Sequence, residues 1–489
     1  MRFLTSLVLL FLVYGLSQAQ TPPSTSTWDQ VPHEAEIATR EFYPQLRREM
    51  AKIRDLALED QYAYSQLEHL ADSIGPRPAG SPQADAAVHY VADQMRNLGL
   101  EVKLEPVMVR RFIRGSDTAE LVEYPGQVPG TKQKIVVTAL LGNAPTPADG
   151  ITGEIVVAHS FDHLISLGRD KVAGKIVLFD FAYDSRKAAA GRAGSAYGES
   201  VRYRSAGAAA AERFGAIASL VRSTGDGAYR LPHTGYSAAA HIPAGAVTAE
   251  DAMLIARLAE KGPVRIHLLL PTHEGPEVQS YNVIGDLKGS EHPEQVVIVS
   301  GHLDSWDLGT GAIDDGAGVA ITTAAAKAIL DGPRPKRTVR LVWFGAEEPG
   351  GLGGEAYAKA HGTEKHALAA EADFGGDQVY AFRANFAQPK SALRDELTTR
   401  LGMIGVVPLH GDAHGGTDVG PMVQKGVPVI DLDNDGTRYF DIHHTPDDTL
   451  DKVDPAQLAQ AIEAWSIMLR TVVDSDDPLA QLPPRQDQE

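Results

Sequence analysis

Residues 295–302 read QVVIVSGH, and residues 301–318 continue as GHLDSWDLGTGAIDDGAG. The first stretch is a continuous apolar, β-branched run, which is typical of a strand buried on both faces of a parallel sheet. It delivers His302 at its end, before a glycine-rich bend that carries Asp314 and Asp315. A second run, TVRLVWFGAEE, ends in the same way at Glu347 and Glu348. Buried strands that end in polar side chains indicate a site built at the edge of a sheet.

Two further segments repeat this pattern. HALAAEADFGG places Asp373 after an apolar stretch, and VPVIDLDND precedes a loop with His443 and His444. In open α/β sheets, ligands bind beyond the carboxyl ends of the strands, so four segments should meet at one edge. We therefore predict an α/β fold with a mixed, mainly parallel sheet sandwiched between helices.

The side chains collected at this edge are imidazoles and carboxylates. They suit zinc, with manganese or cobalt as competing ions. A pair of divalent ions needs one shared carboxylate and further ligands on each side. We assign Asp314 as the bridge, His302 and Asp373 to one ion, and Glu348 and His444 to the other. The pattern predicts a two-metal hydrolase.

Neighbouring residues fit supporting roles. Glu347, adjacent to a ligand but not one itself, would take a proton from the bridging water. Asp304 would orient the imidazole of His302, since a carboxylate behind a ligating histidine fixes its tautomer. His443 is an alternative to His444, or a hydrogen-bond donor, or merely packed. A single Asp-Asp or Glu-Glu pair would indicate only a turn or a solvated helix start, so the ordered set carries the prediction.

The motifs GHLDSWD, AIDDGAG, AEEPGG, EADFGG and HHTPDDTLDKVDP, in this order, resemble the clan MH di-zinc exopeptidases, a family of aminopeptidases and glutamate carboxypeptidases. Further stretches resemble the carboxypeptidase Q branch of that family, including PHTGY at 232–236 and RPKRTVRLVW at 334–343. The similarity runs from about Tyr62 to about Met468.

The resemblance implies a homodimeric exopeptidase with two Zn²⁺ per chain that acts on dipeptides or short peptides with a free N-terminus. It implies that water activated between the two metals attacks the substrate, with Glu347 as general base. It also implies a cis peptide bond from Asp314 to Asp315, which places Asp315 behind the ligands.

The loop LHGDAHGGTDVGPM at 409–422 resembles the segment that lines the specificity pocket of the family. His414 and Asp418 are therefore candidates for contacting substrate, together with His443. Asp418 has an alternative role, since it precedes a helix that we expect to begin near Val419 and could cap it.

Two other function classes share this fold. Glutaminyl cyclases carry out acyl transfer with one zinc, and proteins of the transferrin-receptor type bind partners with broken metal ligands. The intact five-ligand set favours the peptidase over both.

The 489-residue chain is long enough for two domains. We predict a signal peptide at 1–19, N-terminal helices and the first part of the peptidase domain at 20–116, an inserted β-rich domain at 117–272, the main catalytic domain at 273–473 and a disordered tail at 474–489. The insert resembles a protease-associated domain, which could restrict the site to short peptides, serve dimerisation, or be passive. Glycines between 188 and 198 predict a mobile loop within it.

Residues 1–19 have a basic start, an apolar core and a small-residue cleavage site after Ala19, which is typical of a secretory signal. The apolar run is shorter than the roughly 20 residues of a membrane span. We therefore expect a periplasmic or extracellular protein with no membrane contact after cleavage. The chain has no cysteine, so disulfides and thiolate metal sites are excluded. Its net charge of −19 argues against nucleic acid as a partner.

Overall fold

The computed structural model describes residues 48, 51–55, 57, 61–225 and 229–484. The predicted signal at 1–19 lies outside these residues. Within the described part, no helix is both long and apolar enough to cross a membrane. From residue 50 onward the chain forms one compact unit, and all elements described below belong to it.

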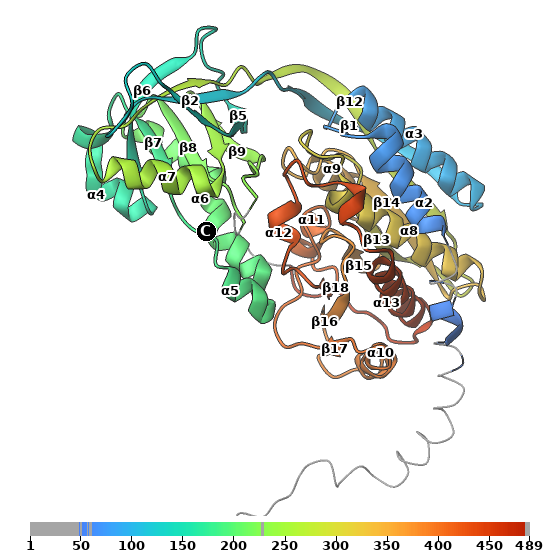
Figure 1. Cartoon of the computed structure of the whole chain (residues 1–489). Helices are drawn as coiled ribbons and strands as arrows, with labels where there is room; N and C mark the ends of the chain where they lie inside the picture. Colours follow the sequence, from blue (N-terminus) through green and yellow to red (C-terminus); the bar gives the residue numbers. More distant parts are fainter. Residues whose placement is uncertain (1–47, 49–50, 56, 58–60, 226–228, 485–489) are drawn as a thin grey trace, which may run out of the picture. The chain divides into compact units, whose positions relative to one another are not determined.

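The first sheet has eight strands in the order β1-β12-β14-β13-β15-β18-β16-β17. Its centre is parallel, because β14, β13, β15 and β18 run in one direction. Strand β12 is antiparallel to β1 and β14, and β16 is antiparallel to β18 but parallel to β17. The central strands lie side by side in Figure 1. The strands are β1 (Glu101–Ile113), β12 (His273–Leu287), β13 (His292–His302), β14 (Arg337–Phe344), β15 (His366–Glu371), β16 (Val379–Asn385), β17 (Val407–Pro408) and β18 (Val429–Asn434).

The predicted apolar runs are the central strands of this sheet. Every residue of β14 and β15 is buried, as expected for strands covered on both faces. In the parallel register, His302 at the end of β13 lies opposite Phe344 at the end of β14, and Ser300 lies opposite Glu371 at the end of β15. The segments that follow these strands therefore start from the same edge.

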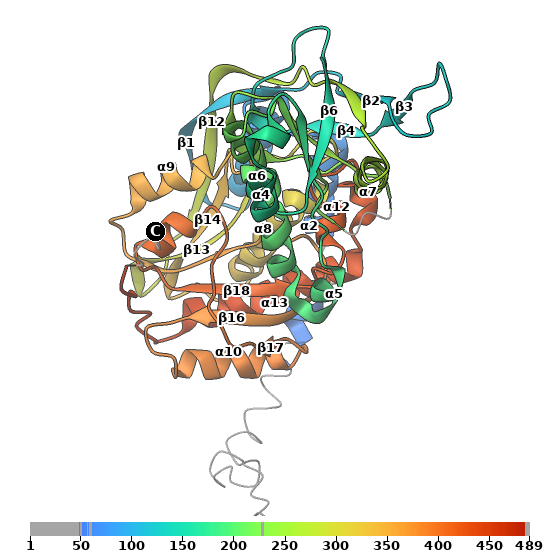
Figure 2. The ribbon, with the colours of Figure 1, turned by 90° about the vertical axis from the view of Figure 1, so that its left-hand side faces the viewer.

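Helices cover this sheet. Helix α8 is almost entirely buried and packs against β13, β14 and helix α13, because its sequence is nearly all small and apolar residues. Helix α13 also contacts β16 and β18, and α10 lies beside β17 (Figure 2). The helices of this part are α2 (Tyr62–Glu68), a π-helical turn (His69–Ile74), α3 (Pro82–Asn97), a π-helical turn (Ala312–Gly316), α8 (Ala317–Leu330), α9 (Leu352–His361), α10 (Ala392–Gly402), α11 (Gly420–Gln424), α12 (Tyr439–Ile442), a 3₁₀ turn (Leu450–Lys452) and α13 (Pro455–Asp474).

A second sheet is inserted between β1 and β12. These two strands pair antiparallel from Glu101 opposite Asp286 to Ile113 opposite His273, so the chain leaves and re-enters the first sheet along a two-stranded ribbon. The second sheet has the order β3-β2-β11-β6-β7-β8-β10-β4, and β5 pairs with β9. Its strands are β2 (Thr118–Glu123), β3 (Gln133–Ile135), β4 (Val137–Ala139), β5 (Leu141–Asn143), β6 (Ile151–Ala158), β7 (Ile176–Phe179), β8 (Ala218–Arg222), β9 (Tyr236–Ala240), β10 (Ala244–Val247) and β11 (Arg265–Leu269).

The helices of the inserted segment correct one expectation. The glycine-containing stretch at 188–198 is a kinked helical segment rather than an open loop. It comprises a π-helical turn (Ala188–Arg192), in which Ala190 and Gly191 have non-helical backbone angles, and the first turns of α6 (Ala193–Arg213). Buried alanines along α6 pack against the sheet and outweigh the low helix propensity of its glycines. The other helices here are α4 (Phe161–Val172), α5 (Ser185–Lys187) and α7 (Ala249–Ala259).

The C-terminal segment corrects a second expectation. Of the tail predicted at 474–489, Asp474 ends α13, residues 475–484 have no regular secondary structure but are held in place, and residues 485–489 lie outside the described residues. The Arg337 side chain donates to the carbonyl oxygens of Ser475 and Asp477, and the Leu482 N–H donates to the Gly426 carbonyl oxygen. Leu479 is buried. Polar composition predicts disorder only when backbone and side chains lack such partners.

Candidate metal centre

The predicted ligands come from four segments that follow neighbouring strands. His302 is the last residue of β13, Glu348 lies four residues after the end of β14, and Asp373 lies two residues after the end of β15. His444 follows α12, in the connection after β18. The structure brings all of them to one edge of the sheet, as the strand pattern predicts.

Asp314 lies between the two histidines. Its Oδ1 is 3.0 Å from Nε2 of His302, and its Oδ2 is 3.1 Å from Nε2 of His444. Asp373 Oδ1 is 3.5 Å from Nε2 of His302, and Glu348 Oε2 is 3.2 Å from Nε2 of His444. The side chains thus form two groups of three that share Asp314, and in each group the candidate ligand atoms lie within 4.8 Å of one another.

The chemistry of these groups fits divalent cations. Imidazole nitrogens and carboxylate oxygens are ligands that zinc accepts. Glu348 Oε1 and Asp373 Oδ1 are buried and have no hydrogen-bond partner in the described structure. Buried carboxylate oxygens without partners are costly, and a bound cation would satisfy them. Each of the two ligand groups contains one such oxygen, which is consistent with one bound cation in each group.

The groups shift one another's pKa values strongly. Burial raises the pKa of Glu348 to about 7 and also raises that of Asp373. Burial likewise acts to raise the pKa of Asp314, but hydrogen bonds from His302 and His444 outweigh it and hold that pKa well below its usual range. Since ligands must be deprotonated to bind metal, ion binding at this centre must release protons.

The geometry changes the predicted role of Asp304. Nδ1 of His302 lies 2.9 Å from the backbone carbonyl oxygen of Asp304, whereas the carboxylate Oδ1 is 3.8 Å away, beyond hydrogen-bond distance. The carboxylate instead accepts the backbone N–H groups of Glu347 and Glu348 at 3.0 and 3.2 Å. The residue therefore contacts the imidazole through its main chain, and its side chain holds the Glu-Glu turn.

The bend around Asp314 is held from behind by buried polar groups. The peptide bond between Asp314 and Asp315 is cis, as the resemblance implies. The Asp315 carboxylate accepts the backbone N–H groups of His302 and Gly318. These hydrogen bonds therefore attach the bend to the end of β13 and to the start of α8.

Two residues of this support were not identified from the sequence. Asp448, the last residue of the HTPDD motif, accepts the N–H groups of Ile313 and Asp314 through its carboxylate. Arg77 is fully buried and donates to five carbonyl oxygens, including those of Thr310 and Gly311. In the sequence, Asp448 lies in the quoted motif and Arg77 lies between two prolines. Neither position by itself predicts which groups the side chain hydrogen-bonds.

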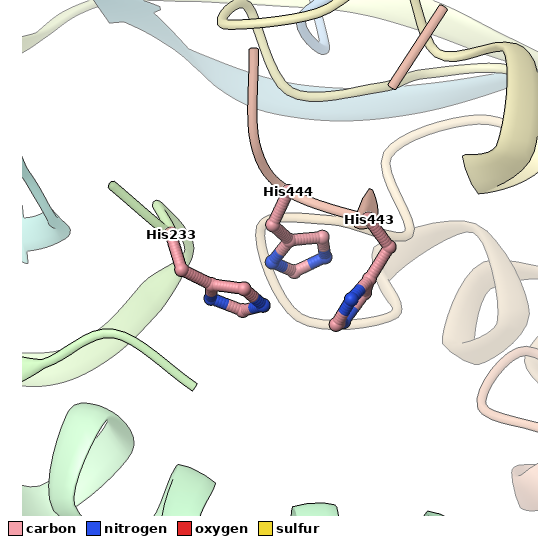
Figure 3. A group of neighbouring side chains, drawn as sticks. All are labelled: His233, His443 and His444. Atoms are coloured by element: carbon pink, nitrogen blue, oxygen red, sulfur yellow. The ribbon is translucent and has the colours of Figure 1, made fainter. Parts of the chain in front are cut away.

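A third histidine, His233, comes from the inserted segment. Figure 3 shows it on a different segment from His443 and His444, with the three imidazoles gathered together. The ring centroids are 4.6 Å apart for His233 and His443 and 5.1 Å apart for His233 and His444. Burial lowers the pKa of His233 and of His443 well below the usual value. His443 stacks on Tyr439 and stays outside the two ligand groups that contain Asp314.

A cavity of about 710 Å³ adjoins the centre at Asp373. The start of α6, from the inserted segment, lines one side of the cavity. The ends of β15 and β18 and the loop that contains His414 line the other side. His414 is exposed there. Asp418 is fully buried and is not part of the lining. Its carboxylate accepts the N–H of Gly354 in the first turn of α9, and it makes no capping bond to α11.

The sequence pattern of Peptidase family M28 matches residues 282–468. Carboxypeptidase Q from Bos taurus is 33% identical over 480 residues, which cover 96% of this chain and 97% of that protein. The chain belongs to peptidase family M28.

Solved structures agree with this assignment. A peptidase M28 precursor from Shewanella amazonensis SB2B is 38% identical, has a TM-score of 0.83 and covers 90% of this chain and 100% of that one. BSAP, a zinc aminopeptidase from Bacillus subtilis, is 21% identical with a TM-score of 0.60, covers 86% and 96% of the two chains, and shares the fold. The predicted α/β exopeptidase fold is confirmed. As an M28 peptidase related to carboxypeptidase Q, the protein is a hydrolase of the metallo-exopeptidase class.

Proposed function

We propose that this M28 peptidase hydrolyses dipeptides and short peptides with a free N-terminus, using two zinc ions per chain. One observation carries the proposal: two groups of imidazole and carboxylate ligands share Asp314, and Glu347 is adjacent to one of them. The zinc named for the B. subtilis aminopeptidase supports the choice of ion. Cobalt and manganese would accept the same donors.

The ligand assignment follows the contacts. His302 and Asp373 would hold one ion, Glu348 and His444 the other, and Asp314 both. Zinc in such a centre polarises the scissile carbonyl and makes water available as a nucleophile at neutral pH.

Glu347 serves as the general base in this proposal. The backbone N–H of Glu347 donates to the Asp304 carboxylate. This hydrogen bond fixes the turn that carries Glu347 beside the proposed ligand Glu348. Burial and the neighbouring carboxylates raise the pKa of Glu347 above its usual value, and such a shift suits a group that accepts and returns a proton near neutral pH. Glu347 takes the proton of the attacking water and delivers it to the amine that leaves. Asp304 and Asp315 position the chain around these groups.

The cavity beside Asp373 is the proposed substrate site. The start of α6 lines it opposite the catalytic strands, which favours short peptides over long chains. His414 is the proposed substrate contact because it lines this cavity. Asp418 acts on the start of α9 rather than on substrate, and His443 packs behind the centre.

The remaining expectations extend this proposal. We propose that residues 1–19 direct export to the periplasm or the extracellular space, that residues 117–272 form the inserted domain within the predicted division of the chain, and that the protein acts as a homodimer. The sequence pattern and the family resemblance support these points.

The test combines metal analysis with a substrate panel. Metal content of the purified protein is measured by mass spectrometry, and hydrolysis of free and N-acetylated dipeptides is followed with and without chelator. The proposal expects about two zinc ions per chain and chelator-sensitive cleavage of the free dipeptides alone. Cleavage of N-acetylated dipeptides at equal rates would contradict the specificity, and a single zinc without cleavage would favour acyl transfer instead.

A further inference from the structure

A short loop of the inserted segment is hydrogen-bonded to the metal-ligand loop. The backbone N–H of Thr234 donates to the carbonyl oxygen of His444 at 3.0 Å. In the other direction, Nδ1 of His444 lies 3.2 Å from the carbonyl oxygen of Thr234. The two loops thus contact each other through a reciprocal pair, although 210 residues separate them in the sequence.

Arg204 on helix α6 fixes this loop. Its Nη1 is 3.3 Å from the Thr234 carbonyl oxygen and 3.4 Å from Nδ1 of His233. Gly235 leaves the room for it, since a Cβ there would lie 2.5 Å from the guanidinium carbon. Gly235 also has φ +149°, which side-chain-bearing residues rarely adopt. Helix and loop are therefore fitted together beside His444.

The tautomer of His444 decides what this contact does. Nε2 of His444 faces Asp314 and Glu348 and is the nitrogen that would bind the ion. Nδ1 must then carry the proton and needs an acceptor. Two groups contact Nδ1, the Thr234 carbonyl oxygen and the Arg204 guanidinium, which is 3.1 Å away. Arginine has no acceptor, so the carbonyl oxygen alone can receive this proton.

We propose that the inserted segment completes one half of the metal centre, with the Thr234 carbonyl oxygen, held by Arg204, orienting His444. The inference rests on the proposed two-ion function. It makes the two ions unequal, because the acceptor behind His302 is the carbonyl oxygen of Asp304 within the catalytic segment itself. Loading of the ion at Asp314, Glu348 and His444 therefore depends on docking of the insert.

A third cation among His233, His443 and His444 is disfavoured, although their nitrogens lie close enough to hold one. His444 Nε2 already faces two carboxylates. The positive charge of Arg204 lies within 3.4 Å of a nitrogen of both His233 and His444. A cation placed there would be repelled, whereas the same guanidinium suits a role in holding the Thr234 carbonyl.

The experiment measures zinc affinity of the metal-free, full-length protein by competition with a chromophoric chelator. Arg204→Gln should weaken one of the two zinc sites by about 10- to 100-fold, the usual effect of removing a group that supports a metal ligand. Gly235→Ala, which displaces the guanidinium, should do the same, and Arg204→Lys should recover part of the affinity. The matched control is Arg202→Gln on the same helix, whose guanidinium packs over Phe161 and Tyr203.

Thermal unfolding separates this role from a loss of folding. Without zinc, Arg204→Gln should unfold at the temperature of the Arg202→Gln control, whereas the stabilisation that zinc adds should shrink. Unchanged affinity at both sites in Arg204→Gln, or an equal fall at both, would overturn the inference. If the wild-type protein itself binds fewer than two ions, the proposed function fails first.

Discussion

The side chain of Asp304 offers a sharp test of how the metal centre is supported. It is 1% exposed, and its two oxygens accept one backbone N–H each, from Glu347 and Glu348. Asp304→Asn keeps the size but turns an NH₂ group toward one of these donors. A hydrogen bond to a charged group contributes about 1.5–3 kcal/mol, and a stranded buried donor costs about 1–3 kcal/mol. Because the two effects overlap, we expect the free energy of unfolding to fall by about 3 kcal/mol.

The same substitution should affect the two ions differently. The carbonyl oxygen of Asp304 that contacts His302 is unchanged, so the ion held on the His302 side should remain. The turn carrying Glu348 loosens, so the other ion should bind more weakly. Zinc titration and thermal unfolding of the metal-free protein measure both effects, with the exposed Asp331→Asn as control. Unaltered stability and zinc binding would refute this reasoning, and preferential loss of the ion beside His302 would restore the carboxylate–imidazole role predicted from the sequence.

Three further changes test other parts of the structure. Glu347→Gln should keep the zinc content but lower kcat by about 10²–10⁴-fold, the usual contribution of a general base. Steady-state kinetics measure this, with the exposed Glu355→Gln as control, and equal kcat values for the two variants would contradict the role of Glu347. Burial raises the pKa of Glu463 to about 7, so the stability it contributes is fully present below its unfolded pKa of about 4.3 and is lost as pH rises toward about 7. The free energy of unfolding of Glu463→Gln should therefore exceed that of wild type by about 1–3 kcal/mol at pH 8, with a higher melting temperature, but not at pH 4. A gain independent of pH would contradict this cause. Gly318→Ala would place a Cβ 1.7 Å from a backbone carbonyl oxygen after β15, so overpacking of about 3 kcal/mol or more should lower the melting temperature, unlike Gly402→Ala, where nothing lies within 4 Å.

The core of the fold was predictable because strands of a parallel sheet are buried on both faces. The run that ends at His302 is apolar and β-branched, and the run that ends at Glu348 is apolar apart from Arg340 and its polar ends; the structure has β13 and β14 there. The start of α3 is encoded locally: the Ser81 hydroxyl oxygen accepts the N–H of Ala84, and proline follows at the first helical position. The stretch at 188–198 and residues 475–484 differ from the prediction because they contact distant residues: the Tyr380 hydroxyl donates to the Gly191 carbonyl oxygen, and Arg337 donates to the Ser475 carbonyl oxygen.

The sequence by itself determined the strand pattern, the ligand types and their order along the chain, since all of these depend on residue identity and short-range spacing. Which atoms meet was decided by the tertiary structure. The carboxylate of Asp304 holds a backbone turn, and Asp418 lies at the start of a helix 64 residues earlier. Arg204 on α6 and Thr234 in the loop before β9 contact His444 from the inserted segment. Such contacts join residues far apart in the chain, and hydrogen-bond geometry at those places is fixed only when the packed elements bring the donors and acceptors together.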